Sequence, residues 1–317
     1  MFAVRRISWI LAFAIFALCA CQDPVVLELR WKLQPGEVLR YRMSVEQSVD
    51  AMAGMGDKPM HMTMEAVMRQ EIRDVAADGT ASVEVSYEAM RFSSDTSAGL
   101  NFDSTLEGAD ADRNDPEFRA MIGPLLDLRL RMKLDPSGKV SELQGVKEML
   151  AAMQARLGKD GEERSVLAMF GEESQMKWLQ FEVFPAKPVV SGETWKRSSE
   201  VRLPSMGTMT IKNENVLRGV EDHAGRPCAV ISSTTRMSLA PEDSSATRME
   251  IKMDGSKGEG TKWFDHERGR MLEAQQTLDT KMSMGSDKDP KDEVRTSMSI
   301  TMRTLLLGKD DPAFGVR

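Results

Sequence analysis

The chain of 317 residues is long enough for one large domain or two ordinary ones, and 41% hydrophobic with 29% charged residues is the balance of a folded protein. Its net charge of -7 makes it a poor candidate for binding the phosphate backbone of nucleic acid. Three cysteines are too few for a disulfide-dense scaffold, and 6% aromatic residues are too few for a base-stacking surface. We therefore expect no nucleic-acid partner.

Residues 1–20 have the pattern of a secretory signal peptide. Arg5 and Arg6 precede an apolar run from Ile7 to Leu18, which only Ser8 interrupts. This run is shorter than the ~20 apolar residues that a membrane-spanning helix needs. The sequence therefore predicts export and cleavage.

The residues Leu18, Cys19, Ala20 and Cys21 resemble the lipobox of bacterial lipoproteins. The resemblance implies lipidation of Cys21, which then becomes the first residue of a protein held on a membrane by its acyl chains. Gln22 in place of Asp favours the periplasmic face of the outer membrane over retention at the inner one. The alternative is an ordinary cleaved signal peptide with an incidental cysteine.

Beyond the anchor, apolar and polar residues alternate with a period of two, which is typical of half-buried antiparallel strands. The first half contains predicted strands at residues 27–33, 39–45, 60–68, 81–89 and 126–134. Residues 93–116 are predicted to be a loop, and Asp115 with Pro116 predicts a short helix through Ile122. Helical spacing follows over 146–157 and 162–184, and the strands resume with 249–253, 282–284 and 298–302.

The second half resembles the first in its turns. Gly36-Glu37 corresponds to Gly192-Glu193, Asp78-Gly79 to the turn at 222–225, and the turn at 135–138 to the turn at 265–269. An internal duplication explains this order, and independent use of common turn residues is the alternative. We predict a mainly β protein with helices (α+β): two related antiparallel curved sheets or half-barrels with a helical insertion between them.

The predicted organisation has five parts. A lipoprotein signal peptide covers 1–20, and a lipidated tether covers 21–26. The first β-meander half with its helical segments covers 27–184, the second β-meander half covers 185–307, and a flexible tail covers 308–317. The lipobox, the twin meanders and their turns resemble an uncharacterised family of bacterial lipoproteins with paired curved β-sheets. A looser resemblance is to lipoprotein-localisation carriers, whose curved sheet wraps helices and holds acyl chains.

Neither resemblance supplies a catalytic residue, and His61, His223 and His266 are scattered along the chain. No zinc-binding or nucleophile motif occurs in the sequence, so we expect neither an enzyme nor a cofactor. His223 and His266 fall in predicted hairpin turns, where we expect solvated side chains. Cys228 lies on an apolar strand, where a buried thiol is the expectation and an intermolecular disulfide is the alternative.

The 25 methionines are the one compositional anomaly. A copper(I) site at Met60, His61, Met62 and Met64 is one hypothesis, because thioethers suit this soft ion. The other is that methionine fills the core in place of leucine and phenylalanine, since the enrichment extends over the whole chain. We predict a non-catalytic binding module for an apolar ligand such as a lipid or an acyl chain. The alternative is a structural or interaction scaffold that binds an envelope protein.

Overall fold

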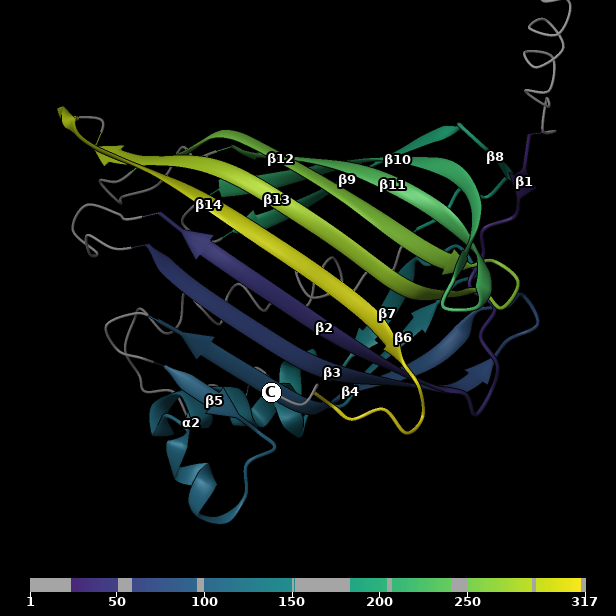
Figure 1. Cartoon of the computed structure of the whole chain (residues 1–317), viewed down its shortest axis with the longest axis horizontal. Helices are drawn as coiled ribbons and strands as arrows, with labels where there is room; N and C mark the ends of the chain where they lie inside the picture. The colour runs from purple at the N-terminus through teal and green to yellow at the C-terminus, as the bar shows by residue number, and fades with distance from the viewer. Residues whose placement is uncertain are drawn as a thin grey trace, which may run out of the picture.

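The computed structural model describes residues 24–50, 59–95, 100–149, 151, 183–203, 207–240, 250–286 and 289–314. Within these residues, twelve strands form one antiparallel sheet, and a separate two-stranded pair lies at one end of it (Figure 1). The predicted mainly β, antiparallel character is thus confirmed.

The strands follow the alternation in the sequence, and most of them extend beyond the predicted ranges. The strand predicted at 126–134 is instead shorter, because the preceding helix continues through Leu126 and the strand begins only at Leu130. The bounds of the strands are β1 (Val26–Leu27), β2 (Val38–Val49), β3 (Met60–Val75), β4 (Ala81–Ser94), β5 (Asn101–Asp103), β6 (Leu130–Leu134), β7 (Val140–Gln144), β8 (Val189–Val190), β9 (Thr194–Leu203), β10 (Gly207–His223), β11 (Arg226–Ala240), β12 (Glu250–Asp265), β13 (Arg270–Ser286) and β14 (Asp289–Leu307). The helices are the 3₁₀ turn η2 (Gly108–Arg113) and α2 (Pro116–Leu126).

The two predicted sheets are joined into a single sheet. The strand order is β7-β6-β4-β3-β2-β14-β13-β12-β11-β10-β9, with β5 paired to β4. Strand β2 of the first half pairs with β14, the last strand of the second half, so that Tyr41 lies opposite Leu306. An unpaired strand edge leaves backbone groups without partners, and the pairing of β2 with β14 removes two such edges.

The predicted corresponding turns make equivalent hydrogen bonds. The Gly36 amide, before β2, donates to the Ile72 carbonyl of β3, and the Gly192 amide, before β9, donates to the Leu217 carbonyl of β10. Both glycines have positive φ, 79° and 86°, which favours glycine. The Asp78 turn connects β3 to β4, as the Asp222 turn connects β10 to β11.

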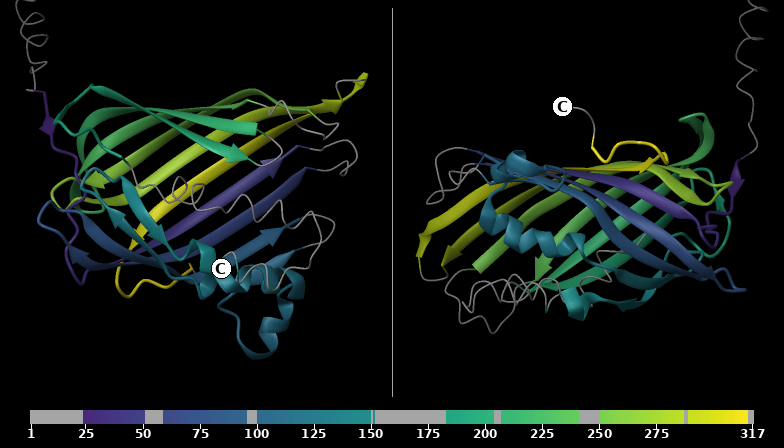
Figure 2. Two further views of the ribbon diagram at one scale, coloured as in Figure 1. Left: turned by 180° about the vertical axis from the view of Figure 1, so that it is seen from behind. Right: turned by 90° about the horizontal axis from the view of Figure 1, so that it is seen from below.

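The sheet is curved (Figure 2). We call the concave face, which carries Tyr41, Ile231 and Phe264, the inner face, and the convex face the outer face. At one end of the inner face these side chains pack with the segment that follows β1, whose Leu29 and Trp31 are buried. Residues 28–33 therefore bury alternate side chains as predicted, but they are not a strand beyond Leu27.

The predicted helix start at Asp115 is confirmed, since the Asp115 side chain accepts a hydrogen bond from the Phe118 amide. The α2 helix packs on the inner face, where Phe118 stacks on Phe92 with ring centroids 4.4 Å apart. The predicted loop at 93–116 contains β5 and η2, because buried Asn114 bonds to the backbone of Asp103 and orders it. Residues 146–149 are helical as predicted, whereas 152–182 of the predicted insertion lie outside the described residues.

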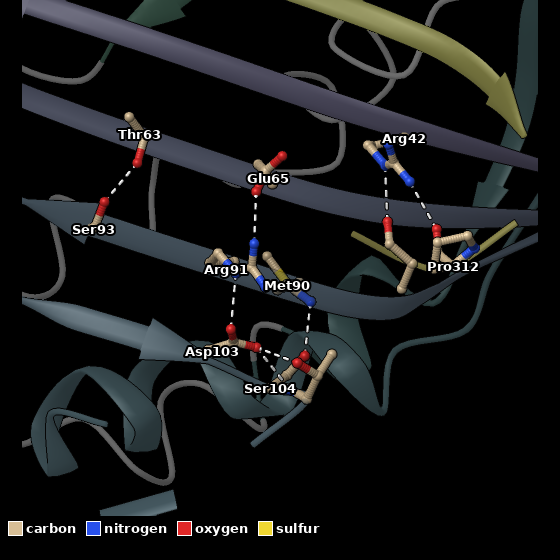
Figure 3. A network of polar contacts seen from close by, with 11 residues as sticks. Arg42, Thr63, Glu65, Met90, Arg91, Ser93, Asp103, Ser104 and Pro312 are labelled. Atoms are coloured by element: carbon tan, nitrogen blue, oxygen red, sulfur yellow. Dashed lines mark hydrogen bonds and ion pairs between the residues drawn. The ribbon is translucent and has the colours of Figure 1, made fainter. Parts of the chain in front are cut away.

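Residues 308–314, predicted as a flexible tail, lie against the outer face. The Arg42 guanidinium donates to the carbonyls of Pro312 and Ala313 (Figure 3). Phe314 packs on Val67, and the Arg91 guanidinium lies 4.3 Å from its ring centroid. The sequence prediction did not include these contacts, which join the end of the described chain to the first half of the sheet.

Candidate functional site: the inner face of the sheet

Methionine gathers on the inner face in strands from both halves of the chain. Side chains alternate between the two faces along each strand, and the register between neighbouring strands shows which of them point to the inner face. Ten of these are the methionines at positions 43, 60, 62, 64, 209, 237, 253, 282, 298 and 302. Sequence alternation in separate strands thus places these methionines on one face of the sheet.

This apolar surface is centred on β14, β2 and β3. Met302 lies opposite Val45, which lies opposite Met64, and the next inward residues along β14 are Ile300 and Met298. Most of these side chains are only half buried, and Met64 is 38% exposed. Phe264 and Leu217 differ, because both are fully buried. They lie at the closed end of the sheet, the end that the segment after β1 covers. Flexible thioethers adapt to apolar partners of irregular shape.

A buried polar network borders the apolar surface on β10 to β13. The Gln276 amide donates to the Thr235 hydroxyl at 2.8 Å, and this hydroxyl donates to the Asn213 side chain at 2.7 Å. The Ser233 hydroxyl donates to the Asn215 side-chain oxygen. Thr235, Ser233 and Asn215 are 4%, 6% and 1% exposed, so these hydrogen bonds satisfy groups that water does not reach.

Two glycines of β12 let the network cross this strand. Gly258 lies opposite Thr235, and Gly260 lies opposite Gln276, so no side chain stands between β11 and β13. A Cβ atom at Gly258 would lie 3.4 Å from the Thr235 Cβ and 2.8 Å from the Thr277 carbonyl oxygen. Both glycines lie within β12 and not in a turn.

Two further donors lie beside this network. The Lys262 ammonium is 3.4 Å from the Asn215 side-chain oxygen. Trp195 on β9 lies opposite Asn215 on β10, and its indole nitrogen is buried without a hydrogen-bond partner. A buried donor without an acceptor is unfavourable, and such a group in a native protein calls for an explanation.

The hypothesised copper residues do not all share a face. Met60, Met62 and Met64 lie on the inner face, whereas His61 between them lies on the outer face, where its backbone amide donates to Asp95. Among the described residues, no group of three or more His, Cys, Asp and Glu side chains is positioned to hold a metal ion. The imidazole is therefore separated from the thioethers by the sheet.

The other singled-out residues have structural partners. Cys228 is fully buried on β11, as predicted, and burial raises the pKa of its thiol to about 11. The His223 ring stacks on Trp263 with ring centroids 4.5 Å apart, and its Nε2 lies 3.1 Å from the Glu273 carboxylate. The predicted solvated side chain is thus instead packed against these two residues. His266 is also half buried. Cys21, the predicted lipidation site, lies outside the described residues.

A cavity of about 620 Å³ lies on the other side of α2, between this helix, η2 and β5. Burial alone would raise the pKa of the Asp103 carboxyl in its lining. Hydrogen bonds from Thr105 and Arg91 outweigh this effect, so the pKa is lowered. The Asn114 side chain bonds to the backbone amide and carbonyl of Asp103, and the Asp103 carboxylate accepts from Arg91 and Thr105, so these hydrogen bonds hold β5 in place.

Sequence reasoning missed the polar network. Asn213 and Asn215, Ser233 and Thr235, and Gly258 and Gly260 occur at spacing two, so each pair lies on one face of its strand. The signal was present, but polar residues at alternate positions are ordinarily assigned to the solvent face. Only the register shows that they point inward.

Residues 78–269 match the model of a family of unknown function, DUF6263. No curated protein matches the sequence. DynF from the dynemicin biosynthesis pathway of Micromonospora chersina is similar at 8% identity and a TM-score of 0.21, covering 92% of this chain and 89% of DynF. A putative exported protein with a YmcC-like fold from Bacteroides fragilis shares 9% identity at a TM-score of 0.23, with coverage of 88% and 97%. No described helix is both long and apolar enough to span a bilayer.

Proposed function

Because the chain belongs to the DUF6263 family, whose function is unknown, we propose from the geometry alone that its inner face binds an acyl chain or a similar apolar ligand. The observation that carries the proposal is the half-buried, methionine-rich surface on β14, β2 and β3. In a filled core, apolar side chains are fully buried, as Phe264 and Leu217 are. This surface instead keeps apolar area available for a partner.

The proposal includes a lipid anchor at Cys21 and an extracytoplasmic location. Support comes from the lipobox-like residues and from the position of β1. This strand pairs with β8 at the closed end of the sheet, where the described chain begins (Figure 1). A tether at this end would leave the methionine-rich region, toward the opposite end, away from the anchoring membrane. Mass spectrometry of the natural protein should find acyl chains on Cys21, and Cys21→Ser should lose membrane association. A natural protein with no acyl mass on Cys21 would overturn the anchor.

We further propose that the two halves arose by duplication of one meander. The equivalent hydrogen bonds of Gly36 and Gly192 support this origin. A second equivalence is that the Gln34 amide donates to the Glu37 carboxylate, as the Val190 amide donates to the Glu193 carboxylate.

A matched pair of variants tests the ligand proposal in the full chain carrying Cys21→Ser. Met302→Lys places a charge on the inner face between Gln276 and Val45, and Thr301→Lys places the same charge on the outer face one residue away. We expect Met302→Lys alone to abolish binding of a fluorescent fatty-acid probe and to lose lipid that co-purifies in native mass spectrometry. Circular dichroism checks that both variants fold.

A protein that retains no lipid and binds no probe would overturn the acyl-chain proposal. That result would favour the alternative of an envelope scaffold, which needs no apolar ligand. Equal binding by Met302→Lys and Thr301→Lys would show that the probe binds elsewhere.

A further inference from the structure

The polar network beside the apolar surface suits a ligand whose two ends differ in polarity. A purely apolar ligand needs only the methionine surface, yet the polar network that borders this surface has a cation and an unpaired donor beside it. Gln276, a member of the network, lies opposite Met302 of the apolar surface, so the two regions are contiguous. This arrangement matches a molecule with a polar head and an apolar chain.

Asn215 contacts one of the two donors through its side chain and lies opposite the other in the sheet. Its oxygen accepts from the Ser233 hydroxyl at 2.5 Å and from the Lys262 ammonium at 3.4 Å, and these contacts draw Lys262 from β12 across β11 toward β10. On its other side, Asn215 lies opposite Trp195, whose indole nitrogen is buried without a partner. Ammonium and indole N–H groups are donors only, so what they recognise is an acceptor.

The chemistry of these donors selects an anion. A positive charge in a partly buried setting binds a negatively charged oxygen more strongly than a neutral one, because hydrogen bonds with both partners charged are the stronger class. From β12 to β3 the sheet spans four strand spacings, roughly 19 Å. A long acyl chain with its head at Lys262 therefore crosses the methionine surface over β13, β14 and β2.

We propose that the ligand is a single-chain amphiphile with an anionic head, whose head oxygens bind Lys262 and the Trp195 indole N–H and whose chain lies over Met302 and Ile300. This inference rests on the proposed acyl-chain function and adds the head group. A fatty-acid carboxylate and the phosphate of a lysophospholipid share the required chemistry.

The test compares three ligands on the full chain carrying Cys21→Ser: oleate, oleyl alcohol and oleoyl lysophosphatidate. In this background, Lys262→Met should weaken oleate binding about tenfold or more while leaving oleyl alcohol within about twofold. Trp195→Phe keeps an aromatic ring but removes the indole donor, and it should weaken oleate selectively as well. Lys257→Met is the matched control, because Lys257 lies on β12 but faces outward, 65% exposed, and should change neither affinity.

The outcomes separate the head site from the chain site. Equal weakening of oleate and oleyl alcohol by Lys262→Met, or no weakening of either, would overturn the head site while the acyl-chain function stands. Failure of all three ligands to bind the unsubstituted protein would overturn both proposals. Preference for lysophosphatidate over oleate, lost in Lys262→Met, would support the anionic head and assign it to a phospholipid source.

Discussion

Gly269 lies where the β12–β13 turn touches the segment that closes the end of the sheet. Its φ is +66°, and a Cβ atom there would lie 2.4 Å from the Lys32 amide nitrogen and 2.6 Å from the Arg30 carbonyl oxygen. The Lys32 amide also donates to the Gly269 carbonyl at 3.2 Å. Gly269→Ala therefore strains the turn and pushes residues 30–32 away from the sheet.

The expected loss has three parts. An alanine at positive φ costs about 1 kcal/mol. The displaced segment loses the Lys32 hydrogen bond, about 1 kcal/mol, and withdraws part of Trp31 from its contacts with Phe264, about 1 kcal/mol more. We expect a decrease of about 3 kcal/mol in the free energy of unfolding, or roughly 6–9 °C in Tm.

Gly225→Ala is the control, because Gly225 has φ +74° and no atom lies within 4 Å of its would-be Cβ. This variant should lose only about 1 kcal/mol. Urea unfolding followed by tryptophan fluorescence measures both losses. If Gly269→Ala and Gly225→Ala lose the same stability, the contact with residues 30–32 carries no energy and the reasoning is wrong.

Three other predictions concern side chains away from this contact. Because burial raises the Cys228 pKa to about 11, the native thiol should not react with iodoacetamide at pH 8, and urea should expose it; rapid labelling of the folded protein would contradict this. Burial of Glu273 raises its pKa, but hydrogen bonds from Gln275 and Arg303 outweigh burial and lower it, so its stabilisation is present above about pH 4.3 and is lost as the pH falls through the lower folded pKa. Acid titrations by circular dichroism should therefore show a shallower loss of stability in Glu273→Gln. Phe314→Ala should lower the free energy of unfolding by about 3 kcal/mol, since the ring is 7% exposed, whereas exposed Asp310→Ala should have almost no effect.

The sequence predicted local features well because their causes are local. Alternation defines the faces of β2, β3 and β4, and the Asp115 cap starts α2 where the Asp-Pro pair indicates. The pairing of β2 with β14 could not be predicted in the same way. Alternation says which face a side chain occupies, but it does not say which strand lies beside it.

The same limit explains the candidate site. Each methionine strand was recognised separately, and only the register of the sheet unites Met62, Met298 and Met282 on one surface. The inward direction of the Asn215 side chain could not be predicted, because apolar and polar residues do not alternate clearly around it, at Glu214 and Val216. Its role follows from Ser233 and Lys262, which are distant in the sequence.

The junction of β2 with β14 has a consequence for how the protein acquires its structure. Ten residues of β2 obtain backbone partners from the last strand of the sheet, so the middle of the molecule stays incomplete until nearly all of the polypeptide is available. Contacts at such long sequence separation slow folding, because loop closure precedes any gain from pairing. A chain that stops short of β14 would keep two open edges in its centre, the arrangement from which intermolecular β-aggregation starts.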